Sequence, residues 1–467
     1  MYLKYLASVL AFVILCFMAF YLPYKINTKQ LKLNPRIDLR SLFVKHLELV
    51  LFAFILLWAA LSLAFSPNKE ISFNGYTSDE HGFKYYLMYI PLFISIFFLN
   101  NKQRRILLDS IVILSLAFVV YEFVLDICGV KGLNDNGELV NKYPVCYTFK
   151  WCAVFRNRNF YGYFLSFAII TPAALFFISK KRILQAYYII AMVLNLFILL
   201  LNQCDGAFLG AIGGLIFILC SFSIAKKKFE KKALIPIIAF IVFYAIFEIS
   251  GLTSYSSSFV KIFKDLFKLS NANEYTDSEI DHLGSNRIKL WKDAFYVMKV
   301  SPLFGNGIDC YLSYSKIIPG TLQIPHNEYL QVGQNMGIPA MLAYVAALIY
   351  IFVKSIINRK NLTQIQLVAL ASGFAYFISA FFGNSWAYMV PYVLFFVAIS
   401  LGYYFKDIDY MNEEEKKQYY VKLLEESSKE GTFNISNAPL SANTNTQPIN
   451  TEETTNNNNS GTTNIQE

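Results

Sequence analysis

The chain has 467 residues, of which 55% are hydrophobic and 16% are charged, and its mean hydropathy is +0.41. Apolar runs of about 20 residues recur, each long enough to cross a bilayer as a helix. The short alternating segments of an outer-membrane β-barrel are not what the sequence shows. We therefore predict an all-α, polytopic membrane protein. Its net charge of +9 reflects membrane orientation and contact with anionic lipids, so no nucleic acid is expected as a partner.

The apolar runs predict eleven membrane spans, with twelve as the upper count. The first run lacks a small-residue cleavage site and is long for a signal peptide, so we expect it to remain as a helix. The predicted spans are 5–24, 47–66, 85–100, 106–127, 159–179, 183–202, 207–225, 233–249, 335–353, 363–382 and 387–405.

Lysine and arginine are unevenly divided between the two sides of these spans. One set of alternate loops carries 20 Lys and Arg in 43 residues, whereas the other carries 15 in loops about three times as long. Because cytoplasmic loops retain positive charge, the first set is predicted to be cytoplasmic. The C-terminus is then inside and, with eleven spans, the N-terminus is outside.

The largest predicted outer loop covers residues 250–334. Apolar residues recur at helical spacing over 256–269, opposite lysines, so we expect a helix that lies on the outer membrane surface or caps the domain. Residues 271–284 are polar and loop-like. A second amphipathic helix is predicted over 286–299, ending before Pro302.

Residues 1–405 are predicted to form one membrane domain. The charged cytoplasmic segment 406–431 follows and is compatible with a short surface helix. Residues 432–467 are rich in Asn and Thr and nearly free of large apolar side chains, which predicts a disordered tail.

The chain has seven cysteines, and none is spaced with histidines as in a zinc site. Cys128, Cys146 and Cys152 fall on the predicted outer side, where a disulfide can form. Buried apolar thiols are the alternative, and the sequence leaves both open.

Polar residues suited to chemistry at a membrane surface gather in the large outer loop. Arg287 opens the second amphipathic helix, where its guanidinium and the free backbone N–H groups favour a phosphate, although pairing with a carboxylate is an alternative. Gly305 and Gly307 permit a tight turn. His326 follows Pro325 and is expected in the first turn of a helix, whose dipole favours a neutral general base. A structural hydrogen bond is the other interpretation of His326.

A second polar group lies where two central spans meet the outer side. Arg156, Arg158 and Asn159 open the span near 159–179 and can face an anionic headgroup, although interfacial anchoring explains them equally. Asp205 is the apex of the tight turn before the next span. It either orients a basic residue or caps the helix that follows.

Taken in order, these motifs resemble the O-antigen ligase and polymerase family. An Asn-containing motif opens a central span, and a polar turn, R-x-x-x-W, P-x-x-G-x-G and H-N-x-Y-L follow. The matching stretches are Arg158–Gly162, Gln203–Gly210, Arg287–Trp291, Pro302–Gly307 and His326–Leu330, all within residues 155–340.

The resemblance implies a GT-C-type membrane glycosyltransferase of surface polysaccharide biosynthesis. Its donor would be an oligosaccharide on undecaprenyl diphosphate, at the outer face of the cytoplasmic membrane. Its acceptor would be a lipid A core for a ligase or a second lipid-linked glycan for a polymerase. Family members use no nucleotide sugar, metal or other cofactor, since the lipid diphosphate is already a leaving group.

Site residues carry over from the family motif by motif. His326 matches the proposed base that activates the acceptor hydroxyl, and Arg287 matches an arginine that contacts the diphosphate. The predicted binding set comprises Arg156, Arg158, Asn159, Asp205, Gly305, Gly307 and Asn327.

Two features depart from the family pattern. The family commonly has Ser-Arg-Gly at the turn where this chain has Cys204-Asp205-Gly206. An acid does not bind phosphate there without a cation, so we hypothesise that Arg156 or Arg158 supplies the charge and Asp205 orients it. Ligases also commonly have twelve spans with both termini inside, and one fewer helix at the N-terminus of this chain would account for the difference.

Other functions stay open. A protein O-oligosaccharyltransferase would share the superfamily. A polysaccharide flippase is a transporter, and the scarcity of charged residues within spans and of repeated halves argues against it. A non-catalytic scaffold would tolerate replacement of His326.

Overall fold

The structure is a computed structural model, and chain contacts divide it into two units, Met1–Phe405 and Lys406–Glu467. The predicted segments 406–431 and 432–467 lie outside the described residues, apart from Val421. The structure describes residues 47–76, 81–97, 99, 101–128, 131–133, 139–141, 153, 155, 157–226, 231–310, 324–357, 362–384, 389–401 and 421.

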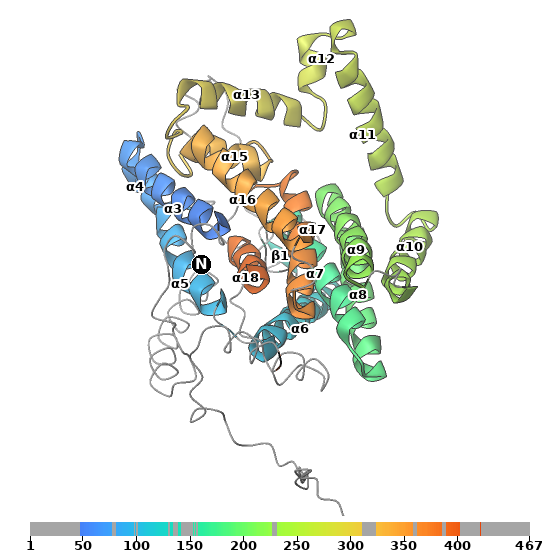
Figure 1. The fold of residues 1–467 in the computed structure, drawn as a ribbon. Helices are drawn as coiled ribbons and strands as arrows, with labels where there is room; N and C mark the ends of the chain where they lie inside the picture. The colour runs from blue at the N-terminus through green and yellow to red at the C-terminus, as the bar shows by residue number, and fades with distance from the viewer. Residues whose placement is uncertain are drawn as a thin grey trace, which may run out of the picture. The chain divides into compact units, whose positions relative to one another are not determined.

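The first unit is built from helices, which confirms the predicted all-α class (Figure 1). One small exception is a hairpin that the sequence did not predict, in which Gly132 lies opposite Val140. The elements in order are α3 (Leu47–Phe65), α4 (Lys69–Asn74), α5 (Phe83–Phe97), α6 (Asn101–Cys128), β1 (Lys131–Leu133), β2 (Leu139–Asn141), α7 (Arg158–Ile178), α8 (Arg182–Asn202), α9 (Asp205–Lys226), η1 (Lys231–Ala233), α10 (Leu234–Ile249), α11 (Tyr255–Ser270), η2 (Ala272–Glu274), α12 (Asp277–Asp281), α13 (Arg287–Val300), α15 (Glu328–Met336), α16 (Ile338–Ile357), α17 (Gln364–Ala380) and α18 (Val390–Leu401).

The described helices account for every predicted span except the first. Seven of them are long and apolar enough to cross a bilayer, and α5, α17 and α18 are shorter apolar helices. The predicted span 5–24 lies outside the described residues. The chain is therefore a polytopic membrane protein.

Helix α7 is the centre of the packing. It contacts α8, α9 and α17, and all but its ends is buried (Figure 1). A membrane helix buried around its whole circumference contacts protein rather than lipid, so α7 positions its neighbours. Its first turn carries the predicted residues Arg158 and Asn159.

Glycines on α9 allow α17 to approach closely. Gly206, Gly210 and Gly214 recur at four-residue spacing, which puts them on one helix face. A Cβ built on Gly210 would lie 2.4 Å from the carbonyl oxygen of Ala375, and one on Gly206 would lie 2.8 Å from Cβ of Phe382. Small residues at such spacing let membrane helices pack backbone to backbone.

Gly210→Ala should destabilise the protein by about 1–3 kcal/mol, because the added methyl meets backbone that cannot move aside without separating α9 from α17. Thermal unfolding in detergent measures the effect. Gly373→Ala on α17 is the matched control, since its Cβ would meet its nearest atom at 3.6 Å, an ordinary contact. Equal melting temperatures for the two variants would contradict the packing argument.

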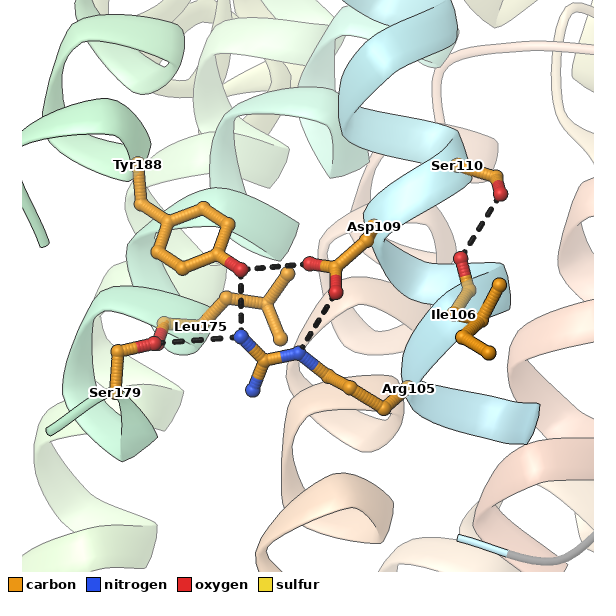
Figure 2. A network of polar contacts seen from close by, with 7 residues as sticks. All are labelled: Arg105, Ile106, Asp109, Ser110, Leu175, Ser179 and Tyr188. Atoms are coloured by element: carbon orange, nitrogen blue, oxygen red, sulfur yellow. Dashed lines mark hydrogen bonds and ion pairs between the residues drawn. The ribbon is translucent and has the colours of Figure 1, made fainter. Parts of the chain in front are cut away.

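A polar network ties α6, α7 and α8 together at the end of α7 opposite to Arg158 (Figure 2). Arg105 donates to Asp109 at 3.0 Å and to Ser179 at 3.3 Å, and it also donates to the hydroxyl of Tyr188. Tyr188 in turn donates to Asp109 at 2.7 Å. Lys232, from η1, donates at 3.3 Å to the carbonyls of Phe176 and Phe177 near the end of α7 and to that of Ser179, which follows α7. The charges of Arg105, Asp109 and Lys232 are therefore paired within the fold, at the end of α7 opposite to Arg158.

The large loop after α10 contains more helix than predicted. Helices α11 and α13 confirm the two amphipathic helices. The expectation of a loop over 271–284 is wrong in part, since η2 and α12 form there. Thr276 and Glu279 cap α12 reciprocally, which stabilises even this five-residue helix.

Candidate functional site

The first turn of α13 contacts two other segments of the loop region. Arg287 and Trp291 lie four residues apart, so they share one face of the helix. The indole N–H of Trp291 donates to the carbonyl oxygen of Pro325 at 3.0 Å, and its ring meets that of Phe381 edge-on at 5.5 Å. The Arg287 guanidinium lies 5.9 Å from the centre of the Phe382 ring. The R-x-x-x-W motif thus joins α13 to the segment before α15 and to the end of α17.

His326 lies just before a helix and not in its first turn, which corrects the prediction. The side chain of Asn327 accepts a hydrogen bond from the N–H of Leu330 at 3.1 Å, so Asn327 is the N-cap and α15 begins at Glu328. His326 adopts a φ of +49°, in the left-handed region that His tolerates better than most residues. The Pro325 carbonyl on one side and the Asn327 cap on the other fix its backbone.

The surroundings of His326 favour the neutral imidazole. Burial lowers the pKa of His326, and the nearby Arg287 guanidinium lowers it further. Its Nδ1 lies 3.3 Å from the amide nitrogen of Asn384. A neutral histidine beside a cation is suited to accept a proton from a substrate hydroxyl.

The start of α7 packs against the turn between α8 and α9. Asn157 caps α7 by accepting from the N–H of Asn159 at 2.8 Å, and Asn202 donates to the carbonyl of Arg158 at 2.9 Å. A Cβ on Gly162 would lie 2.5 Å from Cβ of Cys204, so only glycine permits this approach. The predicted residues Arg158 and Asn159 are therefore held beside the turn that carries Asp205.

Asp205 lies among cations. Its half-buried carboxylate accepts a hydrogen bond from Ser258 of α11, and Arg287, Arg158 and Lys261 all interact with it electrostatically. The structure thus brings the predicted residues Asp205, Arg158 and Arg287 together. Arg156 lies outside the described residues.

Lys261 was not predicted from the sequence. It reaches the site because α11 docks on the α8–α9 turn through Tyr255, whose hydroxyl donates to the Leu199 carbonyl at 2.9 Å. The Tyr255 ring also stacks on Phe208 at 4.2 Å. In the sequence, the signal for this docking is a tyrosine at the start of an amphipathic helix, which does not specify the partner.

Residues 381–384, which follow α17, connect the parts of the site. The Tyr163 hydroxyl donates to the Phe382 carbonyl at 2.9 Å, and a Cβ on Gly383 would lie 2.5 Å from the Tyr163 ring. Phe382 also faces Arg287, and Asn384 faces His326. The sequence placed residues 381 and 382 in the span 363–382 and residues 383 and 384 in the short outer turn after it.

Gly305 and Gly307 pack the loop before α15 onto that helix. Both have positive φ, at 64° and 90°. A Cβ on Gly305 would lie 2.5 Å from the Asn335 backbone, and one on Gly307 would lie 2.2 Å from Oγ of Ser66. The N–H of Gly307 donates to the Asn335 carbonyl at 3.1 Å. The described contacts of these glycines are with protein, and a contact with substrate stays a prediction.

Glu328, also missed from the sequence, is buried two residues after His326. Its two carboxylate oxygens accept hydrogen bonds of 2.7 Å from the hydroxyls of Tyr344 and Tyr376. Burial raises the pKa of Glu328, while the two hydroxyls favour its charged form. Glu328 therefore anchors α15 to α16 and α17.

Among the described residues, Cys204, Cys220 and Cys310 are free cysteines. Burial raises the pKa of Cys204 to about 11, so its thiol is neutral near pH 7. The side chains of Cys128, Cys146 and Cys152 lie outside the described residues, and their predicted disulfide stays open.

Residues 190–345 match the family model described as O-antigen ligase, whereas no curated protein matches the chain. The matched region runs from α8 into α16 and includes Asp205, Arg287 and His326, while α7 precedes it. Over this region the chain is similar to the O-antigen ligase family, in agreement with the resemblance that the order of its motifs predicted.

Proposed function

We propose that the protein transfers an oligosaccharide from undecaprenyl diphosphate to a hydroxyl of a glycan or lipid-glycan acceptor, at the outer face of the cytoplasmic membrane. The observation that carries the proposal is the convergence of a neutral base, His326, with the cation Arg287. Glycosyl transfer from a lipid diphosphate needs both, since a proton leaves the acceptor as negative charge develops on the diphosphate.

The reaction proceeds by displacement at the anomeric carbon of the donor sugar. The acceptor oxygen forms the new glycosidic bond and its proton passes to His326. The bond between the anomeric carbon and the diphosphate oxygen breaks, and the diphosphate leaves with the electron pair. Arg287, with its planar fork of donors, stabilises that developing charge.

Further positive charge for the diphosphate comes from Arg158 of α7 and Lys261 of α11. Both are exposed and both interact electrostatically with the Asp205 carboxylate. Asp205 then acts as an orienting group where the family commonly has an arginine. This extends the hypothesis drawn from the sequence, in which an arginine at the start of α7 replaces the missing charge.

The location at one membrane face is supported by the direction of the helices. Helix α7 begins at the site, α8 and α17 end there, and α9 begins there, so the site lies at one end of these four helices. The loops at this end belong to the set poorer in lysine and arginine, which favours the outer side.

Reconstituted transfer tests the function. The full-length protein in lipid vesicles should convert an undecaprenyl-diphosphate oligosaccharide and a lipid-linked glycan acceptor into an extended glycan and undecaprenyl diphosphate. A UDP-sugar supplied as the only donor should give no product. A serine- or threonine-containing peptide as acceptor tests the protein O-oligosaccharyltransferase alternative. Movement of the lipid-linked donor across the vesicle without cleavage would instead support a flippase and overturn the proposal.

A further inference from the structure

The orientation of the His326 ring raises a question that the general-base role leaves open. A neutral imidazole carries one proton, on Nδ1 or on Nε2, and only the other nitrogen can accept a proton. The group facing Nδ1 is the side-chain amide of Asn384, at 3.3 Å. The atom of Asn384 that faces Nδ1, either the carbonyl oxygen or the amide nitrogen, therefore decides which ring nitrogen is the base.

The side-chain amide of Asn384 is buried, and one of its two polar atoms lacks a hydrogen bond among the described residues. Asn384 is 4% exposed, and its Oδ1 has no hydrogen-bond partner among the described residues. The two ends of an amide have nearly the same shape, so either Oδ1 or Nδ2 fits beside the ring. A buried carbonyl oxygen without a partner is costly, whereas facing an N–H donor would satisfy it.

We propose that Oδ1 of Asn384 accepts a hydrogen bond from Nδ1–H of His326 and so leaves the lone pair on Nε2 for the acceptor hydroxyl. Asn384 is then a positioning residue for the proposed glycosyl transfer, and its role in that reaction rests on the proposed function. The tautomer itself is a property of the protein alone.

The segment that carries Asn384 is held firmly enough for this role. The carbonyl of Phe382 accepts from Tyr163 at 2.9 Å, and Gly383 lies against the Tyr163 ring with no room for a side chain. On the other side, Trp291 holds the Pro325 carbonyl at 3.0 Å. The ring and the amide are thus presented to each other by two anchored segments, as an oriented base requires.

The charged groups around the His326 imidazole favour a neutral side chain, such as asparagine, at position 384 over an acidic one. Arg287 of α13 disfavours the imidazolium, Tyr163 of α7 has a neutral hydroxyl, and Glu328 of α15 is engaged by Tyr344 and Tyr376. An aspartate at position 384 would stabilise the imidazolium and weaken the base at low pH, whereas asparagine orients the ring without adding charge.

Nitrogen NMR of histidine-labelled, full-length protein tests the tautomer directly. The chain has only four histidines, so subtracting the spectrum of His326→Gln identifies the His326 signals. We expect Nδ1 to carry the proton near pH 7.5 and Nε2 to be unprotonated. The reverse assignment overturns the inference even if transfer activity is normal, and the expected assignment stands even if the chain proves to have another function.

Two variants extend the test to activity. Asn384→Ala should release the tautomer preference and lower kcat about 10-fold or more, a share of the roughly 10²–10⁴-fold effect of a general base, with the KM for the lipid donor little changed. Asn384→Asp should restore the tautomer and move the acidic limb of the pH–rate profile to higher pH. An unchanged tautomer in Asn384→Ala, or an unmoved limb in Asn384→Asp, would contradict the inference.

Discussion

Replacing His326 with asparagine should lower the rate of transfer by at least about 100-fold, because general-base catalysis contributes roughly 10²–10⁴-fold. Asparagine is the informative substitution, since it tolerates the φ of +49° at this position and removes only the imidazole. His282→Ala is the matched control. His282 is exposed and bonds to Asn286 at 2.7 Å, so its loss should leave transfer unchanged.

The pH dependence gives this prediction a second readout. Only the deprotonated imidazole is a base, so activity should fall as the pH drops through the pKa of His326. Burial and Arg287 both lower that pKa, which places the acidic limb below the usual value of about 6.5. A His326→Asn variant with wild-type transfer, or a limb that lies above the usual histidine value, would remove His326 from the mechanism.

The sequence predicted the helices well because each apolar run is long and its composition alone makes it helical in a bilayer. Helix α13 followed from the same kind of periodicity, with Arg287 and Trp291 on one face. Helix α12 was missed although Thr276 and Glu279 form a recognisable capping pair, since it is too short to show periodicity.

The site was only partly predictable, because its geometry depends on contacts between distant segments. The position of His326 before α15 follows from the cap at Asn327, since α15 begins at Glu328, three residues later than a helix started by Pro325. Nothing near Asn384 in sequence indicates that it faces His326. Lys261 reaches Asp205 only through the docking of α11.

The departure at Asp205 illustrates the same limit. The local sequence shows an acid where the family commonly has an arginine, which by itself predicts a weaker diphosphate site. In the folded chain, that acid interacts electrostatically with Arg158, Lys261 and Arg287, which belong to three different helices. We therefore expect the substitution within this motif to be offset by cations that belong to other parts of the chain.

Arg287→Ala should cause the other large loss, about 10²-fold or more in kcat/KM, because it removes a preorganised donor from the site where charge develops. Arg287→Lys should recover only part of the activity, since an ammonium keeps the charge but lacks the planar fork. Lys289→Ala is the matched control, being an exposed cation two residues along α13 and on a different face of the helix. Transfer assays over a range of donor concentrations measure all three variants.

The same substitution should also change the pH profile, which separates this site from a general loss of folding. Arg287 lowers the pKa of His326, so its removal should move the acidic limb of the residual activity to higher pH, whereas Arg287→Lys should leave the limb near its wild-type position. A damaged fold would lower the rate at every pH without moving the limb. If Arg287→Ala loses no more activity than Lys289→Ala, or if its limb does not move, the guanidinium does not act on both the leaving group and the base. A combined effect on rate and limb would mean that one cation stabilises the diphosphate and keeps the histidine neutral, which couples the two halves of the transfer through a single side chain.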